Sequence, residues 1–154
     1  MKKHYKIRIL VDDDVQKQFS IRFPSQIEFY VVAYLNDPNG WSSKGYSFEP
    51  VSSNEDVLIR LSSKETIQKV CGIPNNLSCA ELGGRHMYLN ASRWFHGSSE
   101  SKLNLDDYRQ YMISHEIGHI LGFDHQKCPC AGCKAPIMMQ QTLGIGKCKP
   151  NTTV

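Results

Sequence analysis

An eleven-residue stretch from His115 to His125, H-E-I-G-H-I-L-G-F-D-H, constrains this chain more than any other feature. His115 and His119 are separated by about one helical turn, so both side chains project from one helix face and can bind one ion. Gly122 favours a left-handed helix end, which would bring His125 back as a third nitrogen ligand. Three imidazoles leave one tetrahedral zinc position open, which is typical of a catalytic rather than a closed structural site.

Glu116 lies beside the first histidine, where it can reach a water on the metal without being a ligand. Two histidines four residues apart could be surface imidazoles, but the added Glu, Gly and third His favour zinc binding. A chain that retains its ligands can still have lost catalysis, and the intact Glu116 argues against that. We therefore predict metal-assisted hydrolysis with Glu116 as the catalytic base and one catalytic Zn²⁺ ion on His115, His119 and His125.

Size and composition indicate one ordinary globular domain. The chain has 154 residues, of which 40% are hydrophobic and 21% charged. The net charge of +3 comes without a basic run interleaved with aromatic residues, so no nucleic-acid partner is expected. No apolar stretch approaches the roughly 20 residues that a membrane span needs. We expect a monomer.

Residues 1–11 are basic at the start but lack the uninterrupted apolar core of a signal peptide, and they predict a first strand instead. Either the protein stays inside the cell, or the sequence is a trimmed mature form. We expect a secreted or exported protein because of its cysteines, with a cytoplasmic location as the alternative.

Six cysteines form an even set with fifteen possible pairings. Proximity in the sequence favours Cys71–Cys79 as one disulfide. The other four cysteines could pair as Cys128–Cys148, which would close the tail, and as Cys130–Cys133, a tight local pair. Such bridges would indicate an oxidising compartment. Free thiols are one alternative, and the C-x-C-x-x-C spacing from Cys128 to Cys133 leaves a second metal site as another.

Periodicity predicts alternating strands and helices. The expected strands cover residues 5–11, 46–51, 57–61 and 85–90, the last continuing to 94, and the expected helices cover 25–36, 64–70 and a long segment ending at 121. Asn104 or Asp106 is expected to cap the long helix. Asp12, Asp13 and Asp14 indicate a turn and a possible helix cap, and the last thirty residues look irregular.

A methionine in a tight turn follows the histidine motif. Met138 is thirteen residues beyond His125, within Ala135-Pro136-Ile137-Met138-Met139-Gln140. With it the chain resembles the metzincin zinc metallopeptidases, in which such a Met-turn packs beneath the zinc site. Met138 matches that position best, and Met139 is the second choice.

More narrowly, the chain is similar to an uncharacterised family of metzincin-like domains described mainly from actinobacteria. This likeness rests on Cys128-Pro129, Ala135-Pro136-Ile137-Met138 and Gln140-Gln141, with weaker echoes from about residue 30 onward. Two departures stand out, because Cys130 and Cys133 are extra and no helix is evident in residues 142–154. Gln140 also stands where some metzincins carry a tyrosine that assists the reaction.

The resemblance implies an α+β fold with a five-stranded, mixed and mostly parallel sheet, an antiparallel edge strand above the cleft and the active-site helix below. It implies a single metallopeptidase domain over 1–154, with an N-terminal subdomain (1–122) and a short irregular C-terminal one (123–154). We expect the edge strand at residues 85–90, where an extended peptide or protein substrate would add as a further strand. The expected substrate-binding residues are Arg85, His86, Met87, Tyr88, Leu89 and Asn90.

The activity implied is that of a zinc-dependent endopeptidase. The alternative is a zinc-containing module that holds extended peptides without cutting them.

Overall fold

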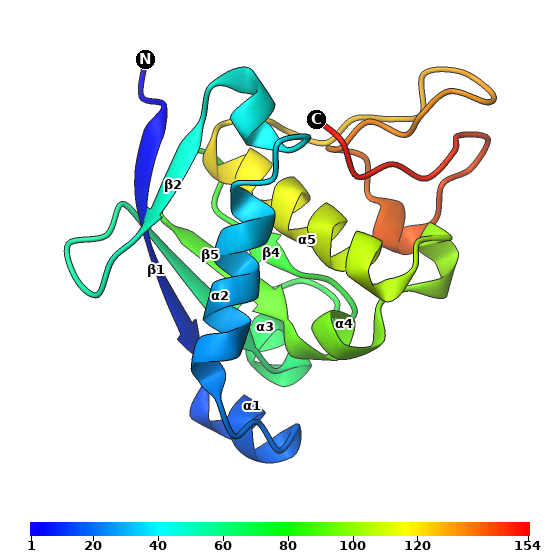
Figure 1. The fold of residues 1–154 in the computed structure, drawn as a ribbon. Helices are drawn as coiled ribbons and strands as arrows, with labels where there is room; N and C mark the ends of the chain where they lie inside the picture. The colour runs from blue at the N-terminus through cyan, green and yellow to red at the C-terminus, as the bar shows by residue number, and fades with distance from the viewer.

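The computed structural model describes residues 1–154 and contains one five-stranded sheet with helices packed against it (Figure 1). The strand order is β2-β1-β3-β5-β4, in which β4 alone runs antiparallel to its neighbour. This confirms the expected mixed, mostly parallel sheet with an antiparallel edge. The strands are β1 (His4–Val11), β2 (Ser47–Pro50), β3 (Val57–Ser62), β4 (Cys79–Ala80) and β5 (His86–Asn90).

Helices α2 (Pro24–Leu35) and α5 (Leu105–Ile120) cross the same face of the sheet in Figure 1. In α2 the buried side chains are Ile27, Val31 and Leu35, spaced four residues apart, so a narrow stripe faces the core. Helical periodicity predicts Tyr30 on the same apolar face, but its side chain is 53% exposed. The remaining helices are α1 (Asp13–Gln18), α3 (Lys64–Cys71), α4 (Ala91–His96) and three short 3₁₀ turns, η1 (Trp41–Lys44), η2 (Ser99–Ser101) and η3 (Gln141–Leu143).

The long helix α5 is buried on nearly every side from Tyr108 to Ile120. Its N-terminus is capped by Asn104, whose side-chain oxygen accepts a hydrogen bond of 2.8 Å from the backbone N–H of Asp107. Of the two expected caps, Asn104 is therefore the one used. Asp106 instead accepts a hydrogen bond from the Tyr34 hydroxyl. No helix of the fold has both the length and the apolar character needed to cross a bilayer.

Two expectations about the strand at residues 85–90, which corresponds to β5, are wrong. The strand ends at Asn90, because the Asn90 side chain accepts a hydrogen bond from the Ser92 N–H and starts α4. It also does not lie at the edge, since β5 pairs with β3 on one side and with β4 on the other. The antiparallel edge is β4, whose two residues are too few to give a periodic sequence signal.

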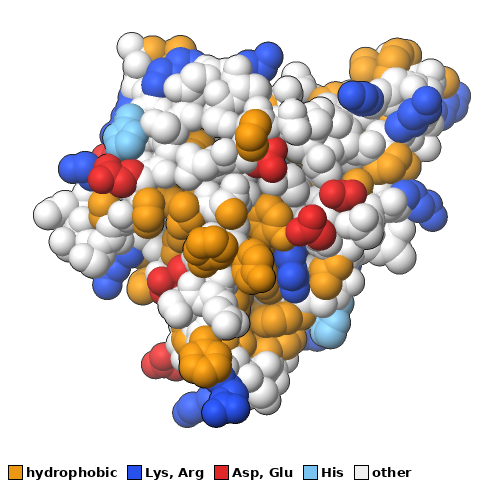
Figure 2. Space-filling view, viewed as in Figure 1, with side chains coloured by type: hydrophobic (Ala, Val, Ile, Leu, Met, Phe, Trp, Pro, Cys, Tyr) orange, Lys and Arg blue, Asp and Glu red, His pale blue; other side chains and the backbone are white.

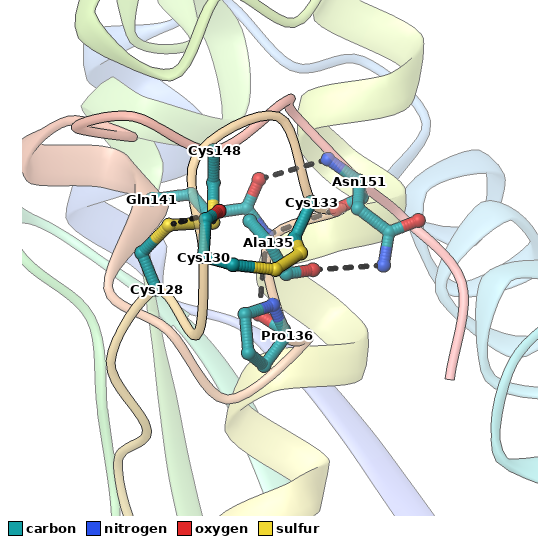
Figure 3. The surroundings of a disulfide bond; sticks show 8 residues. All are labelled: Cys128, Cys130, Cys133, Ala135, Pro136, Gln141, Cys148 and Asn151. Atoms are coloured by element: carbon teal, nitrogen blue, oxygen red, sulfur yellow. Dashed lines mark hydrogen bonds between the residues drawn. A yellow bond between two sulfur atoms is a disulfide. The ribbon is translucent and has the colours of Figure 1, made fainter.

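All six cysteines are paired, and the three disulfides Cys71–Cys79, Cys128–Cys148 and Cys130–Cys133 confirm the expected pairing. A second metal site on the C-x-C-x-x-C segment is thereby ruled out. Two of the bridges gather the irregular tail, shown in Figure 3. Beyond η3 the tail has no helix, and side-chain amides hold it instead. Asn151 donates to the Ala135 carbonyl at 2.9 Å, and Gln141 donates to the Asn151 carbonyl at 2.9 Å.

The acidic triplet after β1 joins two strands rather than capping a helix with its side chain. Asp12 precedes α1, but its carboxylate makes no cap hydrogen bond. It accepts two hydrogen bonds of 3.0 Å from the Arg60 guanidinium and one of 2.7 Å from the Ser62 hydroxyl. This contact ties the end of β1 to β3.

We expect Asp12→Ala to lower the free energy of unfolding by about 1–3 kcal/mol, because charge-assisted hydrogen bonds to a partly buried carboxylate are lost together. Urea denaturation followed by circular dichroism measures this. The matched control is Asp13→Ala, which removes an exposed neighbouring carboxylate. An equal loss of unfolding free energy in the two variants would contradict the role assigned to Asp12.

Candidate metal centre

Three histidines from the expected motif converge at the C-terminal end of α5. His115 and His119 lie on the helix, and the chain then reverses at Gly122, whose φ of +103° is in the left-handed region. This reversal brings His125 back toward the helix. One ligand atom from each ring lies within 4.8 Å of the others. The local conformation predicted from the sequence is therefore present, and the three rings form a group that could hold a metal ion.

Backbone carbonyls orient two of the three rings. His115 donates from Nδ1 to the Ile137 carbonyl at 2.9 Å, and His119 donates from Nδ1 to the Phe123 carbonyl at 2.8 Å. Each bond leaves Nε2 free as the ligand atom. Nε2 of His119 lies 3.1 Å from Nε2 of His125. Two nitrogens bound tetrahedrally to one zinc ion are about 3.3–3.4 Å apart, so this donor set fits the ion.

Burial keeps two of the three histidines, His115 and His119, neutral. It lowers the pKa of His115 to about 3 and also lowers the pKa of His119, mainly through desolvation of the charged form. At neutral pH both imidazoles are unprotonated, which is the form that binds metal. Asp124 does not orient a ring, since its carboxylate accepts a hydrogen bond of 2.7 Å from the backbone N–H of His125 and acts as a turn residue.

Glu116 is buried beside this cluster with an unsatisfied oxygen. Its Oε2 has no hydrogen-bond partner, and desolvation by burial raises the pKa of its carboxyl to about 8. A buried carboxyl group without partners is costly. A cation held by the adjacent imidazoles would offset part of that cost. The carboxyl group and all three histidines line the same cleft.

The cleft has a volume of about 260 Å³ and runs between α5 and the edge strand. Its walls are largely apolar. Besides the histidines, Glu116 and Asp124, they comprise Ile73, Leu77, Ser78, Cys79, Ala80, Leu82, Tyr108, Tyr111, Met112, Gln140 and Thr142.

None of the six residues expected to bind substrate lines this cleft. Met87, Leu89 and Asn90 are buried within the sheet. Arg85 donates to the Glu55 carbonyl, and His86 contacts Glu81 at 2.7 Å.

The segment that does line the cleft is the short β4 hairpin, which the sequence analysis missed. Its sequence signal is the pair Gly83-Gly84 before the recognised strand, which marks a tight hairpin turn. The Gly83 N–H donates to the His119 carbonyl at 2.8 Å, so the hairpin is fixed to the end of α5.

Met138 packs against α5, the helix that carries His115 and His119. It lies in a turn closed by a 2.9 Å hydrogen bond from the Met139 N–H to the Pro136 carbonyl, and its side chain is buried. Gly118 of α5 packs directly on it, and an added Cβ would overlap Met138 Sδ and come within 3.0 Å of Trp41. Trp41 donates from Nε1 to the Ser114 carbonyl at 2.8 Å.

Tyr111 fixes the turn segment to α5 from the other side. Its hydroxyl donates to the Met139 carbonyl at 2.9 Å and accepts from the Gln141 N–H at 2.9 Å. Together with the Ile137 carbonyl on His115, these bonds hold residues 137–141 along the helix that carries the histidines.

A family model described as "Protein of unknown function (DUF3152)" matches residues 1–151. The chain belongs to this family. Among curated proteins nothing matches this family member.

Solved structures similar to it include the crystal structure of myroilysin, at 15% identity and a TM-score of 0.46, covering 87% of this chain and 50% of that one. Another is archaemetzincin from Archaeoglobus fulgidus, at 16% identity and a TM-score of 0.41, covering 97% of this chain and 95% of that one. The chain spans about half the length of the myroilysin chain.

We expect Gly118→Ala to destabilise the protein by about 1–3 kcal/mol, because the added methyl group overpacks the contact between α5 and Met138. The same substitution at an exposed helical glycine would instead raise the free energy of unfolding by about 0.5–1 kcal/mol. Urea denaturation gives the value. In a Met138→Ala background the cost of Gly118→Ala should shrink, and a stabilised Gly118→Ala single variant would contradict the packing.

We expect the purified protein to bind one zinc ion per chain, measured by metal analysis and competition with a chelator. His125→Ala should weaken zinc binding by more than about 100-fold, because residues that merely orient ligands already contribute about 10–100-fold. His86→Ala, which removes an exposed histidine outside the cluster, should leave the affinity unchanged. Similar affinities in both variants would argue against the three-histidine site.

Proposed function

We propose that this protein is a zinc-dependent endopeptidase of the metzincin type, with one zinc ion on His115, His119 and His125. The observation that carries the proposal is the convergence of three imidazoles within 4.8 Å beside the buried, unpartnered carboxyl of Glu116. The turn at Met138, whose side chain packs against Gly118 of the helix that carries two of the histidines, supports the metzincin assignment.

Zinc in this position would supply Lewis acidity, which polarises a scissile carbonyl and makes water a better nucleophile. Glu116 is the only acidic side chain that is buried in the cleft, so we assign it the proton transfers. It takes a proton from the attacking water and passes it to the leaving amine as the peptide bond breaks. Asp124, which also lines the cleft, is exposed and already bonded to the His125 N–H.

An extended peptide would bind along β4. This strand is paired only with β5, so its other edge is free to accept backbone hydrogen bonds from a substrate. The apolar cleft wall from Ile73, Leu77 and Leu82 would receive an apolar substrate side chain next to the scissile bond. Backbone pairing fixes the direction of the substrate chain, and this wall supplies selectivity for the side chain next to the scissile bond.

The cellular setting follows from the cysteines. Three disulfides favour an oxidising compartment, so we propose that the protein is secreted or exported and acts as a monomeric single domain on peptide or protein substrates.

The wild-type protein loaded with zinc should cleave a peptide library, and chelation should abolish cleavage. Glu116→Gln should lower kcat/KM by about 10²–10⁴ while zinc content is retained, because only the proton-transfer group is removed. Mass spectrometry of the products and metal analysis of the same sample measure both quantities. Glu65→Gln, at an exposed site on α3, is the matched control. Zinc-loaded wild type that binds peptides without cutting them would identify a peptide-binding module instead.

A further inference from the structure

Charge is distributed unevenly along this chain. All fifteen acidic residues lie before residue 125, together with fourteen of the eighteen Lys and Arg residues. Residues 126–154 contain no acidic residue and four lysines: Lys127, Lys134, Lys147 and Lys149. We call residues 126–154 the basic lobe. The net charge of +3 is therefore the sum of a nearly neutral body and a locally positive lobe.

Backbone pairing brings three of these lysines together. The Gly132 N–H donates to the Lys147 carbonyl at 2.8 Å, and the Ala135 N–H donates to the Lys149 carbonyl at 2.8 Å. Lys134 and Lys149 are direct partners in an isolated β-bridge. The disulfides Cys128–Cys148 and Cys130–Cys133 (Figure 3) lie directly before this bridge, since Cys133 precedes Lys134 and Cys148 precedes Lys149. In Figure 2 basic side chains gather at the upper right, over the loops coloured orange and red in Figure 1.

This arrangement is electrostatically unfavourable for the isolated protein. Like charges directly opposite each other across a bridge destabilise the pairing. All four lysines are exposed, and none makes an ion pair or a side-chain hydrogen bond. Covalent crosslinks thus hold together positive charges that nothing in the chain neutralises. A negatively charged partner would relieve the repulsion.

The lobe opens directly onto the proposed active site. A groove of about 630 Å³ runs between residues 122–126 and the tail, and Lys134 is the only basic residue that lines it. This groove shares His125 and Asp124 with the cleft that contains Glu116. Asp124 is the only acidic side chain that lines the groove, and it lies next to His125, so Lys134 marks the positive end of the groove.

We propose that the basic lobe binds acidic residues of the substrate, and that the protein acts on peptide segments rich in Asp or Glu a few residues from the scissile bond. This inference rests on the proposed peptidase function and specifies its substrate class. The apolar cleft next to the β4 hairpin receives the side chain nearest the cleavage point. Lys134, with Lys149 beside it, selects the more distant acidic residues.

The test measures binding without cleavage, in the full chain carrying Glu116→Gln and loaded with zinc. Two fluorescein-labelled peptides share one leucine-containing centre and differ only in flanking residues, Glu in one and Gln in the other. By fluorescence anisotropy at about 20 mM salt, the Glu peptide should bind about tenfold more tightly. The difference in affinity between the two peptides should become smaller at about 500 mM salt, where charges are screened over a few ångströms.

Lys134→Glu/Lys149→Glu should remove the preference for the Glu peptide, and the milder Lys134→Gln/Lys149→Gln should reduce it. The matched control is Lys17→Glu/Lys69→Glu, which changes the net charge equally at exposed sites on α1 and α3, far from the lobe in Figure 1. Circular dichroism verifies that each variant is folded. The proposal is overturned if the wild-type lobe binds the two peptides equally. It is also overturned if the control variant loses the preference for the Glu peptide to the same extent.

Two further outcomes are distinguishable. A sulfated polysaccharide that displaces the Glu peptide and binds more tightly would overturn the peptide assignment in favour of another polyanion. Absence of cleavage by the wild type contradicts the proposed peptidase and leaves this binding comparison intact. Cleavage of Glu-flanked and Gln-flanked peptides at equal rates would support the proposed peptidase function and overturn the acidic substrate class.

Discussion

The site depends on how one buried helix ends. Helix α5 can place two imidazoles one turn apart, but a third nitrogen reaches them only if the chain reverses immediately after the helix. Gly122 allows that reversal with its left-handed φ, and the Phe123 carbonyl produced by the turn then orients His119. A single backbone conformation therefore supplies both the third histidine and a hydrogen-bond partner for the second.

Burial of so many polar groups must be compensated within the protein. His115 and His119 are satisfied by the carbonyls of Ile137 and Phe123, which come from segments that follow the helix. Glu116 has no such partner for Oε2, and this makes it the exception in the site. An unsatisfied buried carboxyl at a cleft is a feature of functional rather than structural positions, because stability alone would select against it.

The sequence predicts the site better than its surroundings. The histidines, Glu116 and the glycine are close in the chain, so local helix geometry is enough to place them. The Cys71–Cys79 disulfide also follows from proximity in the sequence. The edge strand does not, because Cys79 and Ala80 form a strand only through pairing with β5, and two residues show no periodicity. The predicted burial of Tyr30 is wrong for a related reason, since the position of α2 on the sheet decides which side of the helix is buried.

The structure of the C-terminal tail also could not be predicted in detail from local sequence patterns. Its composition predicts an irregular segment, and the structure agrees, but the order comes from long-range contacts. Asn151 and Gln141 exchange hydrogen bonds across ten residues, and the Lys134–Lys149 bridge joins segments fifteen residues apart. No local pattern encodes these contacts, so neither the groove beside His125 nor its positive end could be foreseen from the sequence.

The central claim is that three histidines bind a zinc ion with an open coordination position. X-ray absorption spectroscopy at the zinc edge of the metal-loaded protein tests it most directly. The account predicts three imidazole nitrogens at about 2.0–2.1 Å with the remaining ligand an oxygen from solvent. A sulfur ligand at about 2.3 Å, or a fourth protein nitrogen that closes the site, would contradict it.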